Sequence, residues 1–209
     1  MDIIESLRWR YATKKFDSEK ILPKEKINTL TEAFNLTATS YGLQPLKLIV
    51  IKDKKLQNEL TQHSWNQQQV ADASHVLVFC TEMTIGEDYI EKHFDNIKTT
   101  RNTPEEILNP FKEQLVNSFS NKSSEEVSNW AAKQAYLAMG NLLTVCAIEE
   151  IDACPMEGFI PEKYDEILKL SDLGLKSILV LPVGYRANDD MFSEFKKVRR
   201  SISDTIITI

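Results

Sequence analysis

Apolar residues recur along the chain with two different periods, and the change between them predicts helices that alternate with short buried strands. Ile3, Ile4 and Leu7 follow a helical spacing over residues 2–9. Pro23 suits the first turn of a second helix. The remaining segments with a helical pattern are, in chain order, 57–69, 86–100, 104–121, 125–150 and 161–170.

Three short apolar runs predict buried strands, at 46–51, 75–80 and 177–183. Strands separated by helical stretches indicate a layered α/β or α+β domain. The final residues 205–209 are also strand-like, but no strand follows them in this chain to serve as a partner. Because an unpaired apolar strand is a liability, we expect it to pair elsewhere, for example with another subunit's sheet.

The expected elements fit one domain over residues 1–209, with a helical lobe at about 86–122. The lobe helices are amphipathic and rich in charge, so we expect them to lie on the surface of the body. The pattern over 125–150 is the longest, and it carries small residues on more than one face. Such a helix can pack closely against several neighbours, which suits a central helix or a dimer seam.

The composition narrows the classes of function. The formal net charge of -6 and a pI of about 5.2 argue against general nucleic-acid binding. No apolar run approaches the roughly 20 residues of a membrane helix, and the N-terminus lacks the pattern of a signal peptide. Three cysteines without a CxxC pair favour reduced thiols and a cytoplasmic protein. The three histidines are too scattered for a metal site, and no G-x-G-x-x-G follows a strand, so a Rossmann dinucleotide site is not expected.

Cations near both ends of the chain are the candidate chemistry. Arg10 and Lys14 follow the first predicted helix, and Lys197 and Arg199 lie near the C-terminus. Between them, residues 155–158 have the sequence Pro-Met-Glu-Gly, in which a proline and a glycine allow a tight backbone turn beside a flat ligand. Together these segments suggest an anionic planar cofactor, although cations at a helix end are also commonly only solvated.

The order and spacing of these segments resemble the FMN-dependent, oxygen-insensitive NAD(P)H nitroreductase family, which includes dihydropteridine reductase-like members. The resemblance extends from Asp2 to about Arg199. It also includes the loop 38–45, the signature Asp-Ala-Ser-His-Val at 72–76, and Trp-Ala-Ala-Lys-Gln at 130–134, which we interpret as structural. The resemblance implies a homodimer with an α+β fold: a three-layer sandwich whose mostly antiparallel sheet is flanked by helices. The C-terminal strand would be domain-swapped, and two FMN sites would lie at the interface.

The resemblance also implies roles for individual residues. Arg10 falls on the position that binds the FMN phosphate, and Lys14 on the position at the pyrimidine edge of the flavin. Lys197 and Arg199 would close over the phosphate, and the backbone N–H of Glu157 would face flavin N5. The complete set of expected cofactor contacts is Arg10, Tyr11, Ala12, Lys14, Thr39, Ser40, Gly42, Asn66, Gln69, Pro155, Met156, Glu157, Gly158, Lys197 and Arg199.

Some positions depart from the family pattern. Tyr11 and Ala12 replace a common His-Ser pair, and Gly42 stands where the family usually has Asn. Gln69 replaces a common Lys near the pyrimidine edge. Because a neutral amide stabilises an anionic reduced flavin less than an ammonium does, we expect a lower reduction potential than in relatives with Lys.

The chemistry that the resemblance implies is a ping-pong reaction. NAD(P)H gives a hydride to the flavin and leaves, and then a nitroaromatic, a quinone or another electron-poor ring takes two electrons on the same face. Two alternatives stay open. One is an FMN enzyme of the same superfamily that fragments flavin or dehalogenates its substrate, and the other is a flavin-free helical interaction protein.

Overall fold

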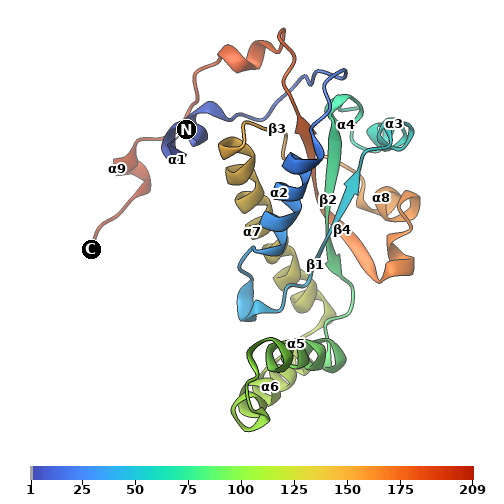
Figure 1. Ribbon diagram of the computed structural model, residues 1–209, viewed down its shortest axis with the longest axis vertical. Coiled ribbons are helices and arrows are strands. Elements are labelled where there is room, and N and C mark those ends of the chain that lie inside the picture. The colour runs from blue at the N-terminus through green and yellow to red at the C-terminus, as the bar shows by residue number, and fades with distance from the viewer. Residues whose placement is uncertain (1) are drawn as a thin grey trace.

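A four-stranded antiparallel sheet forms the centre of the computed structural model, which describes residues 2–209 (Figure 1). The strand order is β1-β2-β4-β3, with every neighbouring pair antiparallel. The strands are β1 (Leu46–Ile51), β2 (His75–Glu82), β3 (Asp152–Ala153) and β4 (Leu175–Gly184). The three strands expected from the sequence are present, and β3 adds a short fourth strand that no apolar run had indicated.

Alternation along β2 divides the core into two layers. Leu77 and Phe79 belong to one apolar cluster, and Val76 and Val78 belong to another, all four fully buried. The first cluster includes residues of α2 (Lys24–Asn35) and α7 (Ser124–Ile148), and the second includes residues of α3 (Lys54–Gln62), α4 (Gln69–Asp72) and α8 (Pro161–Ile167). The molecule is therefore a three-layer sandwich, with helices on both faces of the sheet.

The expected helix over 57–69 is wrong in its extent. The chain forms α3 and then turns, and only afterwards forms the short α4. Trp65 and Asn66 have φ values of 54° and 56° in the turn, a left-handed backbone that cannot continue an α-helix. The polar, helix-favouring composition of this stretch concealed the break. Its consequence is that Trp65 is 71% exposed rather than part of a helix face.

The lobe consists of α5 (Glu87–Arg101) and α6 (Glu105–Ser120), which pack around an apolar cluster of their own. It lies at one end of the long axis of the molecule, away from both termini (Figure 1). The long helix α7 begins at a capping box of Ser123 and Glu126, and it runs from the lobe along the sheet. Within residues 2–209, no helix combines the length and apolar character needed to span a bilayer.

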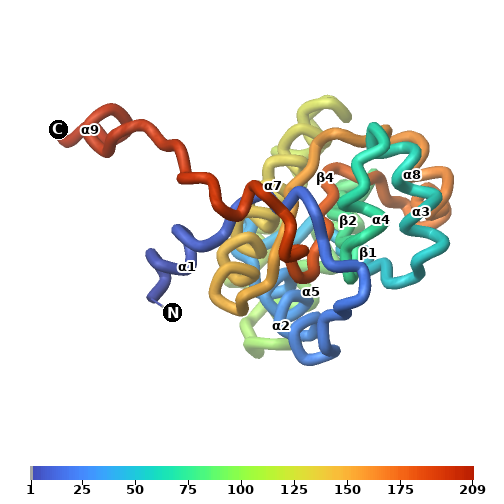
Figure 2. Tube along the Cα trace, turned by 90° about the horizontal axis from the view of Figure 1, so that it is seen from above, coloured from blue at the N-terminus to red at the C-terminus, as the bar shows by residue number. Residues whose placement is uncertain are grey.

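The two ends of the chain project from the same side of the body. Helix α1 (Ile3–Trp9) and the final helix α9 (Ile202–Thr205) both project from the body, and the C-terminal segment reaches outward (Figure 2). Residues 206–209 form no strand in the described chain, and Ile207 is 87% exposed. The expected pairing of this segment with another subunit therefore stays a prediction.

Candidate functional site

A buried carboxylate joins the N-terminal and C-terminal segments. Asp190 is 3% exposed, and its Oδ2 accepts hydrogen bonds from the Tyr11 hydroxyl at 2.8 Å and from the backbone amides of Lys14 at 2.9 Å and Lys15 at 3.1 Å. Its Oδ1 accepts a further bond from the Phe192 amide at 3.2 Å. These bonds hold residues 11–15 directly against the chain that follows β4.

The hydrogen bonds keep Asp190 ionised in spite of its burial. Burial by itself raises the pKa of a carboxyl group, but the donors from Tyr11, Lys14 and Lys15 outweigh it and bring the pKa of Asp190 below its usual value. Burial, and then the bond to Asp190, raises the pKa of Tyr11. Tyr11 therefore acts as a neutral donor at physiological pH.

Neighbouring contacts fix the same segment along the end of the sheet. The Thr13 amide donates to the carbonyl of Ala153 in β3 at 3.2 Å. The Arg186 guanidinium lies 4.3 Å from the centre of the Trp9 ring and 4.6 Å from that of Tyr11, and its Nε donates to Asp152 at 2.7 Å. This ion pair and the two ring contacts hold the residues on either side of Arg10 against the end of the sheet.

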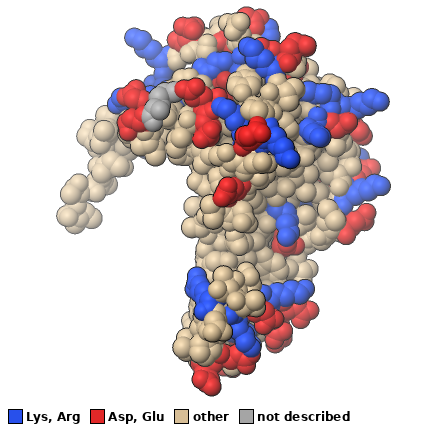
Figure 3. Space-filling model, in the orientation of Figure 1, with Lys and Arg blue, Asp and Glu red and all other residues tan. Residues whose placement is uncertain are grey.

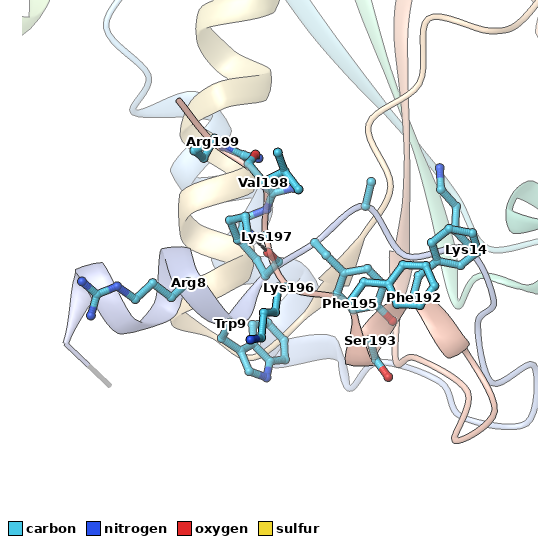
Figure 4. A pocket seen from close by; sticks show the side chains of 13 residues that line it. Arg8, Trp9, Lys14, Phe192, Ser193, Phe195, Lys196, Lys197, Val198 and Arg199 are labelled. Atoms are coloured by element: carbon cyan, nitrogen blue, oxygen red, sulfur yellow. Dashed lines mark hydrogen bonds between the residues drawn. The ribbon is translucent and has the colours of Figure 1, made fainter. Parts of the chain in front are cut away.

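The segments held in this way enclose a cavity of about 390 Å³ (Figure 4). Its aromatic part includes Phe192 and Phe195, whose ring centres are 5.3 Å apart. Four of the cations predicted from the sequence line it together: Arg10, Lys14, Lys197 and Arg199. No carboxylate within residues 2–209 forms an ion pair with any of these four cations.

The cations of the cavity repel one another. Burial lowers the pKa of Arg10, and the charge of Arg199 lowers it further. The pKa of Lys197 is lowered by burial and by both Arg10 and Arg199, although its ammonium also donates to the Arg10 carbonyl. Uncompensated positive charge in a partly enclosed cavity favours an anion, and a phosphate group suits it because arginine can bind two of its oxygens at once.

The turn at 155–158 presents a free backbone amide. Met156 and Val180 exchange two backbone hydrogen bonds, of 2.8 and 3.1 Å, and the Gly158 carbonyl accepts from Gln67 Nε2 at 3.0 Å. The Glu157 amide donates to no acceptor in the part of the chain that the structure describes. The turn is thus anchored on both sides of a donor that is available to a ligand.

Two side chains approach Gly158 closely. A Cβ atom on this residue would lie 2.8 Å from Gln67 Nε2 and 2.9 Å from Trp65 Cε3. The exposed Trp65 ring therefore lies against the turn, beside Glu157. The sequence analysis missed Trp65, and its only signal was a large aromatic residue inside a polar stretch.

Tyr11 and Ala12 also line the cavity, whereas the other predicted residues do not. Asn66 is exposed in the turn after α3, and Gln69 is 8% exposed at the start of α4. Thr39, Ser40 and Gly42 lie beyond the end of α2, toward the lobe and away from the termini (Figure 1). Their loop is held there by Gln134 of α7, which accepts a hydrogen bond from the Ser40 amide at 2.9 Å. Within one chain, therefore, the four cations lie together, but the loop at 39–42 lies apart from them.

The model of the nitroreductase family matches residues 7–185. The chain belongs to the nitroreductase family. A protein of Staphylococcus epidermidis, provisionally named an NAD(P)H nitroreductase, is 34% identical over 98% of this chain and 95% of its own. A similarly named protein of Staphylococcus haemolyticus is 31% identical, with the same coverage.

Solved structures of nitroreductases share the fold. A Bacillus subtilis protein aligns with a TM-score of 0.88 at 18% identity and covers 100% of this chain and 99% of its own. A nitroreductase-family protein of Streptococcus pneumoniae aligns with a TM-score of 0.83 at 25% identity over the whole of both chains. A protein of Exiguobacterium sibiricum, solved in complex with FMN, gives 0.86 at 19% identity and covers 100% of this chain and 98% of its own. These findings confirm the predicted family and its layered α+β fold.

We predict that Asp190→Asn lowers the free energy of unfolding of this chain by about 1–3 kcal/mol at neutral pH, because the uncharged amide offers one acceptor oxygen in place of two to the donors around it. Since the pKa of Asp190 is lowered in the folded chain, its stabilisation is present above about pH 4 and is lost as the pH falls through the folded-state pKa. Urea unfolding from pH 7 to pH 3, at fixed protein concentration, should therefore show a constant difference between wild type and variant that shrinks only below about pH 4.

The neighbouring Asp189→Asn is the matched control. Its side chain is 68% exposed and forms a surface ion pair with Lys15, so the loss of stability in this variant should be much smaller. Equal losses in the two variants would show that Asp190 does not anchor these segments.

Proposed function

We propose that this chain is an FMN-dependent oxidoreductase that uses NAD(P)H to reduce nitroaromatics, quinones or related electron-poor rings. The observation that carries the proposal is the cavity lined by Arg10, Lys14, Lys197 and Arg199, which lack carboxylate partners within residues 2–209. Family membership, the NAD(P)H nitroreductase names of relatives and the FMN held by a protein of the same fold support it.

The residues of the site suit FMN. Arg10, Lys197 and Arg199 would hold the phosphate, whose two negative charges match this cluster. Lys14, Asn66 and Gln69 would bind the pyrimidine edge of the ring, and Pro155 and Met156 would cover one of its faces. When bound, FMN supplies the two-electron chemistry that side chains lack. The unpartnered Glu157 amide would donate to the reactive edge of the ring, at N5. One open site would serve the reductant and then the oxidant in turn, which favours a broad choice of substrates.

The active assembly that we propose is a homodimer. Exposed apolar side chains occur on α1, at Ile3 and Ile4, and on α7, at Leu137. The apolar segment 206–209 is likewise uncovered and would pair with the partner's sheet as a swapped strand. In such a dimer the loop with Thr39, Ser40 and Gly42 would reach the second subunit's flavin. The free, buried thiols of Cys80, Cys146 and Cys154 suit a reducing compartment such as the cytoplasm.

The function is tested by adding NADPH, and separately NADH, to the purified protein without oxygen. We expect a yellow protein whose visible flavin band bleaches promptly, and whose colour returns on addition of a quinone or a nitroaromatic. A yellow protein that stays yellow would move the function to flavin fragmentation or dehalogenation within the superfamily. A colourless protein that takes up no FMN would overturn the cofactor assignment.

We predict that Arg199→Ala weakens FMN binding about tenfold, because a charge-assisted contact to the phosphate is lost. The dissociation constant can be measured by the quenching of FMN fluorescence. Arg200→Ala is the matched control, since Arg200 is an exposed cation that does not line the cavity. Similar losses in both variants would indicate a general charge effect, and an unchanged Arg199→Ala would remove that residue from the site.

We predict that Gln69→Lys raises the midpoint potential of the bound flavin, because an ammonium stabilises the negative charge of the reduced ring. A rise of about 30 mV corresponds to about 1.4 kcal/mol for a two-electron couple. Gln68→Lys provides the comparison, because Gln68 is the exposed neighbour at the start of the same helix. A potential that does not rise in Gln69→Lys, or that rises equally in Gln68→Lys, would contradict a place for Gln69 beside the ring.

A further inference from the structure

Within residues 2–209, the Glu157 side chain makes one hydrogen bond. The backbone on either side of it is fixed by Met156 and Val180, and by the bond from Gln67 to Gly158. The Glu157 carboxylate accepts a hydrogen bond of 2.7 Å from the Tyr136 hydroxyl. No ion pair within residues 2–209 includes this carboxylate, so its side-chain partner is a neutral donor.

Tyr136 comes from the exposed face of α7, and its side chain is 49% exposed. With Lys133, Leu137 and Gly140, it lines an open and largely apolar depression on that helix. The hydrogen bond to Glu157 raises the pKa of Tyr136 and keeps its proton on the phenol. Two residues earlier on the helix, the buried Gln134 binds the Ser40 amide, so neighbouring positions of α7 hold two different candidate loops.

We propose that Tyr136 is a positioning residue that acts through Glu157. Its hydroxyl holds the carboxylate against α7, which fixes the orientation of the Glu157 peptide and keeps its unpartnered amide available to a bound ring. This inference rests on the proposed function, which supplies the ring. It separates two roles: Arg10, Lys197 and Arg199 set the affinity for FMN, and Tyr136 sets the geometry at the reactive edge of the ring.

The test is Tyr136→Phe, which removes the hydroxyl but keeps the exposed ring. We expect kcat/KM for NADPH to fall about tenfold, the effect of losing one hydrogen bond to a charged group. The affinity for FMN should stay within about twofold, because the phosphate contacts are untouched. A fall in FMN affinity that matches the loss of activity would show a structural defect and overturn the proposal.

A double-mutant cycle shows whether the effect passes through Glu157. In a Glu157→Ala background, Tyr136→Phe should cause no further loss, because the acceptor is already gone. In a Glu157→Gln background, which keeps an acceptor oxygen, Tyr136→Phe should still reduce kcat/KM. Losses that simply multiply in the Glu157→Ala background would contradict a role through Glu157.

A measurement on the flavin-free protein separates this proposal from the proposed function. In the ¹⁵N-labelled chain, Tyr136→Phe should shift the amide resonance of Glu157 and speed its hydrogen exchange, while the amide of Gly184 in β4 stays unchanged. If NADPH does not reduce the wild-type flavin but the Glu157 amide responds in this way, the proposed function fails and the positioning contact stands. If the Glu157 amide does not respond, the positioning role itself is wrong.

Discussion

The carboxylate of Asp190 is the constraint on which the arrangement of the site depends. Three of its donors lie 175 to 179 residues earlier in the chain, and two of them are backbone amides. Burying a charged carboxylate is costly unless it is fully hydrogen-bonded, and its bonds are made only when the N-terminal segment lies in one register. That register places Arg10 and Lys14 beside the segment 197–199. A buried anion therefore sets the positions of cations whose mutual repulsion would otherwise drive them apart.

The body supports this arrangement through two elements buried in the core. Strand β4 pairs with β2 on one side and β3 on the other, and the segment that contains Asp190 follows it in the chain. Helix α7 covers the same sheet and presents Gln134 and Tyr136 to loops in different directions. The candidate site is thus built on rigid elements. On the face shown in Figure 3, the upper and lower ends of the molecule carry charges of both signs. Loops fixed to such a scaffold keep their geometry even though few of their own side chains pack into the core.

Sequence periodicity was sufficient for the elements that bury a long apolar face, such as β1, β2, β4 and α7. It failed where local backbone geometry decided the outcome, as at Trp65 and Asn66, whose left-handed conformation interrupts a helix-like composition. The four cations could be predicted because they belong to short sequence segments that can be recognised locally. Asp190 was not predicted, since two of its three distant partners are backbone amides, which nearly every residue type supplies, and the third is a tyrosine hydroxyl 179 residues away. Tyr136 was hidden for a related reason, because its role comes from a contact across 21 residues and not from its position in a pattern.

The distribution of the candidate residues over one chain carries a consequence for assembly. The four cations of the cavity and the loop at 39–42 lie in different parts of the same sandwich, and the loop does not line the cavity. If the loop belongs to the site, as the proposed function requires, each flavin is shared between two copies. A ligand that binds only the assembled state stabilises that state by mass action, so FMN binding and dimer formation would strengthen each other. The exposed apolar face of α1 and α7 would then be covered by the same event that completes the site, and cofactor affinity would depend on protein concentration.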